Sequence, residues 1–358
     1  MMEPMGTASL LGDELLLPDT RNLIPAEEVP VTSFHDREPI RRMMVFSGRS
    51  NTGLATAIGE HLGLTLGEVE LKTFPNGELY VRFCESIRGA DVFLVQSCAV
   101  PVNRNLMELL LMVNAAKLAS AKRITAVMPW YPYSRADKKS APREPISARL
   151  VADILQAAGV DRVLTMDLHA GQVQGFFNIP VDHMTALPMF AQYFRDQGLP
   201  QDRLVVVSPD AGRVKLAKKF AEMLGGELAF INKERPGHSE SRVMTLIGDV
   251  KGKVAIISDD MIDSAGTLCN AAQAVADAGA ERVLACATHA VFSPPALERI
   301  EASVLERVVV CDTIPVDPLT RPAKIEVLSV AGYLAQTIDN VFRDDSVSAI
   351  FKGENQLF

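Results

Sequence analysis

The sequence predicts an α/β protein with two tandem domains, each a mainly parallel sheet flanked by helices. Apolar runs of strand length alternate along the chain with longer runs at helical spacing, as in βαβ units. One unit is also repeated: DVFLVQS, a turn, a helix and AKRITAVMP return about 160 residues later as KVAIISD, a turn, a helix and AERVLACATH. A chain of 358 residues with 48% hydrophobic residues is long enough to bury two such cores.

Composition and charge argue against several classes of protein, among them nucleic-acid-binding, membrane-spanning and exported proteins. A net charge of −8 without a long basic run argues against a nucleic-acid-binding protein. No apolar run is long enough to span a membrane, and the first residues lack the charged-then-apolar pattern of an export signal. The five cysteines are scattered, with none at a metal-ligand spacing, which is typical of reduced thiols. We therefore expect a cytoplasmic protein that binds neither nucleic acid nor membranes.

The domain limits are placed where the pattern of the sequence changes. Residues 1–42 carry five prolines and mixed charges, which predicts a poorly ordered N-terminal extension. Residues 43–185 and 186–342 each hold one of the two similar units. The tail, residues 343–358, is expected to return to the first domain.

In the first half, Met43–Phe46 is an apolar run of strand length, and Thr52–Leu62 has helical spacing that Gly63 can close. The run Glu70–Phe83 alternates about an Asn-Gly pair, which predicts a β-hairpin. The other predicted elements are strands at Asp91–Gln96, Arg123–Met128 and Arg162–Met166, helices at Asn105–Leu118 and Ile146–Ala158, and a short helix in Gly171–Phe177.

Strands and helices alternate again in the second half. Strands are predicted at Leu204–Val207, Leu228–Ile231, Val254–Ser258, Arg282–Ala287 and Val308–Cys311, and helices at Val214–Leu224, Leu268–Ala278 and Pro294–Ser303. The segments Ile325–Leu328 and Tyr333–Phe342 complete this domain, and Ser346–Phe351 has the pattern of a last strand.

The highest concentration of candidate functional residues follows the strand predicted at Val254–Ser258. Three carboxylates and a turn of small residues come in succession there: Asp259, Asp260, Asp263 and Ser264-Ala265-Gly266-Thr267. The helix start after the turn offers unpaired N–H groups and the positive end of its dipole to a phosphate. Carboxylates repel phosphate, but they accept hydrogen bonds from vicinal hydroxyls or bind a metal ion. A sugar phosphate satisfies both ends, whereas a plain helix cap leaves two carboxylates unexplained.

The loop Trp130–Pro145 is the most polar stretch outside the N-terminal extension, and its prolines oppose regular structure. It carries four cations and two tyrosines: Tyr131, Tyr133, Arg135, Lys138, Lys139 and Arg143. A solvated surface loop is the usual explanation of such a run. In an otherwise acidic chain we favour binding of a polyphosphate.

Other polar side chains follow strand ends, where α/β proteins place their ligands. Asp167 and His169 follow one predicted strand and Asp210 another, which makes them candidate metal ligands. A structural histidine and a helix-capping aspartate are the alternatives. Lys233 and Arg235 stand two residues apart in an extended segment and can point the same way, toward the predicted phosphate turn or into solvent.

Seven motifs, in order, resemble those of the class I ribose-phosphate diphosphokinases, also called PRPP synthetases: FPNGE, WYPYSRADKK, REPISA, TMDLHAGQVQGFF, VVSPDAGR, INKERP and DDMIDSAGT. The last motif also resembles the PRPP-binding signature of type I phosphoribosyltransferases. The resemblance covers about Met44–Phe351 and implies two tandem type I phosphoribosyltransferase-like domains. It implies transfer of the pyrophosphoryl group of MgATP to the 1-hydroxyl of ribose 5-phosphate, giving PRPP and AMP for nucleotide biosynthesis.

The same resemblance implies a role for each candidate residue. ATP would be bound by Arg135 and by Phe74, Asn76, Gly77 and Glu78, the last four lent by a neighbouring subunit. Mg²⁺ would be held or oriented by Asp167, His169 and Asp210. Charge on the transferred group would be stabilised by Lys233 and Arg235. Ribose 5-phosphate would be bound by Arg235, Asp259, Asp260, Asp263, Ser264, Ala265, Gly266 and Thr267.

The resemblance implies a homo-oligomer, since a lent adenine site needs at least a dimer, and the family suggests a hexamer. ADP and phosphate are effectors of some members, and Ser346-Val347-Ser348 matches the tail segment associated with that regulation. The chain departs from the family pattern at Ala136, Asn178 and Arg213, where relatives carry Gln, Asp and Gly.

Two other functions remain open from the sequence. A phosphoribosyltransferase would share the Asp259–Thr267 site, and base-dependent consumption of PRPP would identify it. A non-catalytic, synthetase-like regulatory subunit is expected to have lost catalytic cations, yet Lys233, Arg235 and His169 are all present.

Overall fold

The computed structural model describes residues 41–234 and 243–351, with only the backbone described at 233, 234, 243, 244, 349 and 351. The described residues belong to one compact unit. The predicted N-terminal extension up to residue 40 and the candidate Arg235 lie outside the described residues. Within the described ranges, no helix combines the length and the apolar character needed to cross a membrane.

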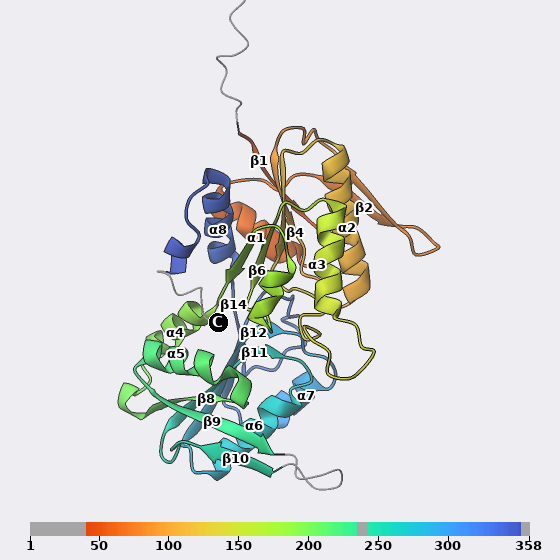
Figure 1. Ribbon diagram of the computed structural model, residues 1–358. Helices are drawn as coiled ribbons and strands as arrows, with labels where there is room; N and C mark the ends of the chain where they lie inside the picture. Colours follow the sequence, from red (N-terminus) through yellow and green to blue (C-terminus); the bar gives the residue numbers. More distant parts are fainter. Residues whose placement is uncertain (1–40, 235–242, 352–358) are drawn as a thin grey trace, which may run out of the picture. The chain divides into compact units, whose positions relative to one another are not determined.

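The first sheet of the described unit has five parallel strands in the order β1-β4-β5-β6-β7. They are β1 (Met43–Ser47), β4 (Asp91–Val95), β5 (Arg123–Met128), β6 (Arg162–Met166) and β7 (Val181–Met184). Side chains alternate between two apolar clusters along each strand, as a pleated sheet requires. On one face lie α2 (Val102–Leu118) and α3 (Ser147–Ala158), and on the other lies α1 (Thr52–Leu62) (Figure 1).

The predicted β-hairpin is confirmed as a separate two-stranded sheet. Strands β2 (Val69–Thr73) and β3 (Leu79–Phe83) pair antiparallel, and Gly77 in the turn has a φ of 90°. Figure 1 shows the hairpin projecting from the first sheet with its turn at the far end. The turn residues are therefore displayed away from the body of this sheet.

The second sheet has seven described strands in the order β10-β9-β8-β11-β12-β13-β14, all parallel except for the β10–β9 pair. They are β8 (Leu204–Ser208), β9 (Glu227–Glu234), β10 (Val243–Ile247), β11 (Val254–Ile262), β12 (Arg282–Ala290), β13 (Arg307–Cys311) and β14 (Ile325–Leu328). One face is covered by α6 (Gly266–Asp277) and α7 (Ala296–Ala302), and the other by α4 (Leu187–Asp196) and α5 (Val214–Leu224).

The repeated unit predicted from the sequence is confirmed. The strands β4 and β5 are parallel neighbours joined by α2, and β11 and β12 are parallel neighbours joined by α6. Short 3₁₀ helices connect other strands: η2 (Gly171–Phe176), η3 (Gln201–Arg203) and η4 (Ala211–Arg213).

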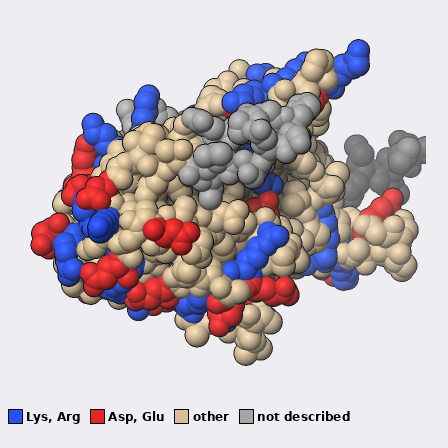
Figure 2. All heavy atoms as spheres, turned by 90° about the horizontal axis from the view of Figure 1, so that it is seen from below, with Lys and Arg blue, Asp and Glu red and all other residues tan. Residues whose placement is uncertain are grey.

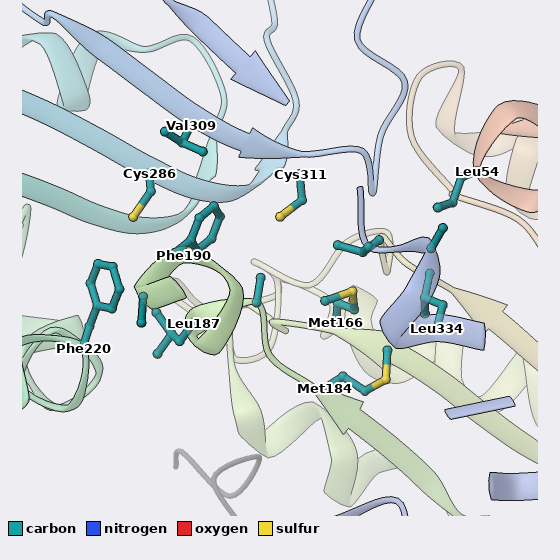
Figure 3. Packing of buried hydrophobic residues seen from close by; sticks show 14 of the residues in the cluster. Leu54, Met166, Met184, Leu187, Phe190, Phe220, Cys286, Val309, Cys311 and Leu334 are labelled. Carbon is teal, nitrogen blue, oxygen red and sulfur yellow. The ribbon is translucent and has the colours of Figure 1, made fainter. Parts of the chain in front are cut away.

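One apolar cluster extends across both sheets. It contains Met166 and Met184 of the first sheet and Cys286 and Cys311 of the second, and Figure 3 shows these side chains together with Leu187, Phe190 and Leu334. The helix α8 (Ala331–Arg343) joins this cluster and packs against α1. The two sheets therefore share buried contacts, and the predicted domain limits stay a prediction.

The prediction of a last strand at Ser346–Phe351 is wrong, because this segment forms the 3₁₀ helix η5 (Ser348–Phe351). Val347 and Ile350 pack against the shared cluster. These residues are three apart, the spacing that a 3₁₀ turn places on one side. The helix α4 and the strand β10 were not predicted at all.

Candidate active site

The carboxylates Asp259 and Asp260 lie inside β11 and not after its end, which corrects the predicted strand. Pairing with β12 continues to Ile262, whereas pairing with β8 stops at Ile257. The two carboxylates therefore project from a strand that has lost one of its neighbours. Beyond the end of β8, β11 is paired on one side only, and its unpaired side leaves room for a ligand.

The turn after β11 leads directly into α6, which begins at Gly266, two residues earlier than predicted. No described side chain caps the helix start, and Ala265 has a φ of 57°. The first N–H groups of α6 are thus available to an anion. Arg299 of α7 donates a hydrogen bond from Nη1 to the Ser264 carbonyl oxygen at 2.9 Å, which stabilises the turn.

Asp260 is nearly buried and is held by two cationic or protonatable groups. Its Oδ2 lies 2.7 Å from His169 Nδ1 and 2.6 Å from Arg213 Nη2. Burial alone raises the pKa of Asp260, but the hydrogen bond from His169 and the charge of Arg213 together lower it to about 2. This carboxylate is therefore ionised at neutral pH.

Asp259 shares the same arginine. Arg213 Nε lies 3.3 Å from Asp259 Oδ1, and that oxygen also accepts a hydrogen bond from the Asp260 amide at 2.9 Å. Burial and the charge of Asp260 raise the pKa of Asp259, and Arg213 opposes this rise. Asp259 thus depends on Arg213 for its compensation, and Asp260 shares that guanidinium and also contacts His169.

A cavity of about 260 Å³ brings most of the candidate residues together. Its wall is formed by Arg135, His169, Asp210, Arg213 and the whole segment from Asp259 to Leu268. Arg135 Nη1 pairs with Asp263 Oδ2 at 2.8 Å on one side of it. Beyond that ion pair lies a second cavity of about 880 Å³, which Trp130 also lines.

Asp210 has the capping role that was one of its two alternatives, and its metal role stays a prediction. Its Oδ1 accepts a hydrogen bond from Gly212 N at 2.9 Å and so caps η4. Its second carboxylate oxygen has no partner among the described residues, and the residue lines the 260 Å³ cavity. A structural cap and a ligand are therefore compatible in one side chain.

Asp167 has a different set of contacts. Its Oδ2 accepts hydrogen bonds from the Ala186 amide at 2.8 Å and from Thr288 Oγ1 at 2.6 Å, and its φ is 33°. These bonds join the first sheet to β12. Asp167 does not line the 260 Å³ cavity, and its metal role stays a prediction.

Among the described side chains, no three His, Cys, Asp or Glu residues are grouped so as to hold a metal ion. Mg²⁺ bound with a polyphosphate takes only one or two carboxylates from a protein, because phosphate oxygens and water complete its shell. Asp210 on the cavity wall fits this demand, with His169 beside it.

The hairpin residues lie outside these cavities. Phe74 is 46% exposed, and Asn76 Oδ1 accepts a hydrogen bond from Glu78 N at 3.2 Å, which shapes the turn. Lys233 belongs to β9 by its backbone, and Arg235 is outside the described residues. The ATP and catalytic roles of these residues stay predictions.

Sequence reasoning missed the contribution of Arg213 to this site. The residue was noted only as a departure from a family pattern, yet its side chain is 13% exposed and contacts both the buried Asp260 and the partly buried Asp259. Its place three residues after Asp210, in the turn that follows a strand, is the signal that could have found it. On the face of the molecule that Figure 2 shows, seen from below, acidic and basic side chains are interspersed.

Two family models match the chain. Residues 43–159 match the N-terminal domain of ribose phosphate pyrophosphokinase, and residues 237–352 match the phosphoribosyl synthetase-associated domain. Together they cover more than half of the sequence, including the turn after β11.

Whole-length relatives agree with these models. A ribose-phosphate pyrophosphokinase of Fusobacterium nucleatum is 53% identical over 307 residues, which are 86% of this chain and 97% of that protein. One of Caldanaerobacter subterraneus is 53% identical over 309 residues, 86% of this chain and 98% of that protein. The crystal structure of phosphoribosylpyrophosphate synthetase from Mycobacterium smegmatis has a TM-score of 0.81 and 45% identity, and covers 85% of this chain and 100% of that one.

Proposed function

The chain belongs to the ribose-phosphate pyrophosphokinase family, and on this premise we propose that the cavity around Asp259–Leu268 is its active site. The enzyme transfers a pyrophosphoryl group to the 1-hydroxyl of ribose 5-phosphate and so makes PRPP for nucleotide biosynthesis. The donor is ATP, as its Mg²⁺ complex, and the second product is AMP.

The observation that carries this proposal is the continuity between the carboxylates of β11 and the uncapped start of α6 along one cavity wall. Ribose 5-phosphate needs acceptors for its 2- and 3-hydroxyls and donors for its phosphate. Asp259 and Asp260 supply the acceptors. Residues Asp263–Thr267 and the first amides of α6 supply the phosphate site.

The reaction requires alignment and charge compensation more than covalent chemistry. The 1-hydroxyl oxygen attacks the β-phosphorus of ATP, the bond from that phosphorus to the α,β-bridging oxygen breaks, and the hydroxyl proton is released. AMP leaves with the bridging oxygen. When bound, Mg²⁺ supplies positive charge to the phosphate oxygens, and Asp210, with His169 beside it, would hold it.

His169 is oriented by the same network that binds the sugar. Its Nδ1 faces Asp260, so its Nε2 is directed away from that carboxylate. Arg135 reaches the cavity edge from the polar loop, where it would meet the polyphosphate. Lys233 and Arg235 would add charge to the transferred group.

The assembly and location are part of the proposal. Phe74, Asn76, Gly77 and Glu78 would hold the adenine of a neighbouring subunit, which makes the enzyme a homo-oligomer, with a hexamer suggested by the family. ADP and phosphate would act as effectors through the tail around Ser346–Ser348. All five cysteines are free, as expected for the cytoplasm.

The test is release of AMP from ATP and Mg²⁺, with and without ribose 5-phosphate. We expect AMP only when the sugar is present, and loss of about a hundredfold or more in rate for Lys233→Ala. The control is Lys218→Ala, which removes an exposed cation of α5 and is expected to keep the rate.

Other outcomes point to other functions. ADP in place of AMP would indicate an ordinary sugar-phosphate kinase. PRPP consumption that depends on a base would indicate a phosphoribosyltransferase. No AMP from folded protein, with phosphate added as an activator, would indicate the non-catalytic subunit, which no observation on the described residues favours.

A further inference from the structure

Arg213 occupies a central place among the cavities of this region. It is the one described residue that lines three of them: the 260 Å³ cavity, a neighbouring cavity of about 330 Å³, and a small inner cavity of about 20 Å³. One side chain therefore forms part of the wall of the proposed sugar site and of the neighbouring 330 Å³ cavity.

The guanidinium contacts three groups of the sugar site at once. Its Nη2 lies 2.6 Å from Asp260 Oδ2 and donates to the His169 carbonyl oxygen at 3.2 Å. Its Nε lies 3.3 Å from Asp259 Oδ1. A planar guanidinium can address several acceptors in a fixed relative geometry, which a lysine ammonium cannot.

The local packing keeps the side chain in this place. Arg213 is the last residue of η4 and directly precedes α5, and only 13% of its side chain is exposed. The inner cavity that it lines has apolar residues such as Leu216 and Ala217 on its wall beside the two carboxylates, and it has room for roughly one water molecule. A shorter residue at position 213 would therefore leave both carboxylates without a cation and admit water.

We propose that Arg213 is a positioning residue for ribose 5-phosphate, which fixes the two neighbouring carboxylates so that both accept hydrogen bonds from the sugar hydroxyls. The inference rests on the proposed function. Two adjacent carboxylates repel each other in a partly desolvated site, and a shared cation offsets that repulsion. Arg213 does this through Asp259 and Asp260, and its loss weakens binding of the sugar more than binding of ATP.

The test measures binding and turnover in the same variants. For Arg213→Gln we expect the dissociation constant of ribose 5-phosphate, from calorimetry without ATP, to rise about ten- to a hundredfold. The KM for ribose 5-phosphate rises in parallel, while the KM for ATP changes by less than about threefold.

Two further variants keep the result interpretable. Arg213→Lys keeps the positive charge but lacks the several planar donors of the guanidinium. It is expected to bind ribose 5-phosphate more tightly than Arg213→Gln and less tightly than the wild type. Lys218→Gln removes an exposed cation from α5 and is expected to bind the sugar as the wild type does. Thermal melting of each variant shows that the fold is kept.

The inference is overturned if Arg213→Gln and Arg213→Lys, both folded, bind ribose 5-phosphate as the wild type does. It is also overturned if they bind it more tightly, because Arg213 would then compete with the sugar. An equal rise in both KM values would contradict a specific role toward the sugar, and a larger rise in the KM for ATP would assign Arg213 to the nucleotide instead. A wild-type protein that makes no AMP would refute the proposed function, and calorimetry with the sugar alone would still decide the role of Arg213.

Discussion

Asp260 is the most buried carboxylate of the proposed sugar site, with 2% of its side chain exposed, compared with 20% for Asp259. A buried charge without partners costs several kcal/mol, so the contacts of His169 and Arg213 decide whether this residue can remain ionised. At the residue scale, the site is a compensated charge cluster and not a set of independent ligands.

The ion pair between Arg213 and Asp260 can be tested by a double-mutant cycle on stability. We expect Arg213→Gln and Asp260→Asn to destabilise the fold separately and to be non-additive together, with a coupling of about 1–3 kcal/mol. Denaturant unfolding of the four proteins measures the free energies.

The matched control is the exposed pair formed by Arg203 and Glu281 at 2.7 Å. The same cycle with Arg203→Gln and Glu281→Gln is expected to give less than about 1 kcal/mol, because water screens both partners. Equal coupling in the two cycles would contradict the importance given to burial at the site.

At the scale of elements, ion pairs between side chains connect the C-terminal end of α8 to the first sheet. Asp344 follows the helix and pairs with Arg123 at 2.7 Å and with Arg41 at 2.8 Å. Arg123 also binds Asp91 at the start of β4. The helix is thus held by apolar packing against α1 and by a charge network at its C-terminal end.

This network predicts a pH dependence of stability. Hydrogen bonds from Arg123 and Arg41 lower the pKa of Asp344 to about 2, from near 4 in an unfolded chain. Because the folded pKa is the lower one, the stabilisation is present above about pH 4 and is lost as the pH falls through about 2.

We therefore expect Asp344→Asn to be less stable than the wild type at pH 5 and nearly equal to it at pH 2, as measured by circular dichroism during denaturant unfolding. Asp345→Asn, next in the chain and exposed, is the control. An equal loss of stability at both pH values would show that the ion pairs are not the cause.

The β2–β3 hairpin is the other element with a testable role. Phe74 is 46% exposed in the single chain, so Phe74→Ala is expected to change the melting temperature little and to raise the KM for ATP. If the hairpin serves a neighbour, co-expression of Phe74→Ala with Asp260→Asn restores activity in mixed oligomers. No recovery in oligomers shown to be mixed would mean that each chain uses its own hairpin.

At the scale of the whole molecule, the apolar cluster that spans both sheets is expected to make them unfold together. Phe190 of α4 is 1% exposed within this cluster, so Phe190→Ala is expected to cost about 3–5 kcal/mol in free energy of unfolding. Leu319→Ala, at a residue 92% exposed, is expected to cost almost nothing.

Two signals can follow this unfolding, the fluorescence of Trp130 and the circular dichroism of the helices. We expect them to change at the same denaturant concentration in both variants, because a shared core couples the two sheets. Separate transitions would show that the sheets are independently stable.

Much of the fold could be predicted because its signals are local. The helix Thr52–Leu62 has the predicted limits, since the spacing of its apolar residues and Gly63 define both ends. The hairpin is set by Asn76 and Gly77 for the same reason. The turn Ser264–Thr267 was recognisable as a candidate anion site because strand, turn and helix are contiguous in sequence.

Other features depended on partners far away in the chain. Strand β11 runs on through Asp259 and Asp260 because β12 still pairs with it there, which no pattern within the strand reveals. The tail became a 3₁₀ helix because Val347 and Ile350 meet the shared cluster. The place of Arg213 depends on three segments that meet in space: the residues after β6, the turn after β8 and the second half of β11.

By itself, the sequence determined the α/β class, the repeated βαβ unit, the family and the candidate residues for sugar-phosphate chemistry, because their signals lie in short contiguous segments. Only the tertiary structure decided that one core joins both sheets and that Asp167 ties them together. It alone placed Arg213 against the two neighbouring carboxylates. The physical reason is that burial and charge compensation are properties of neighbours in space, and these neighbours are distant in the sequence.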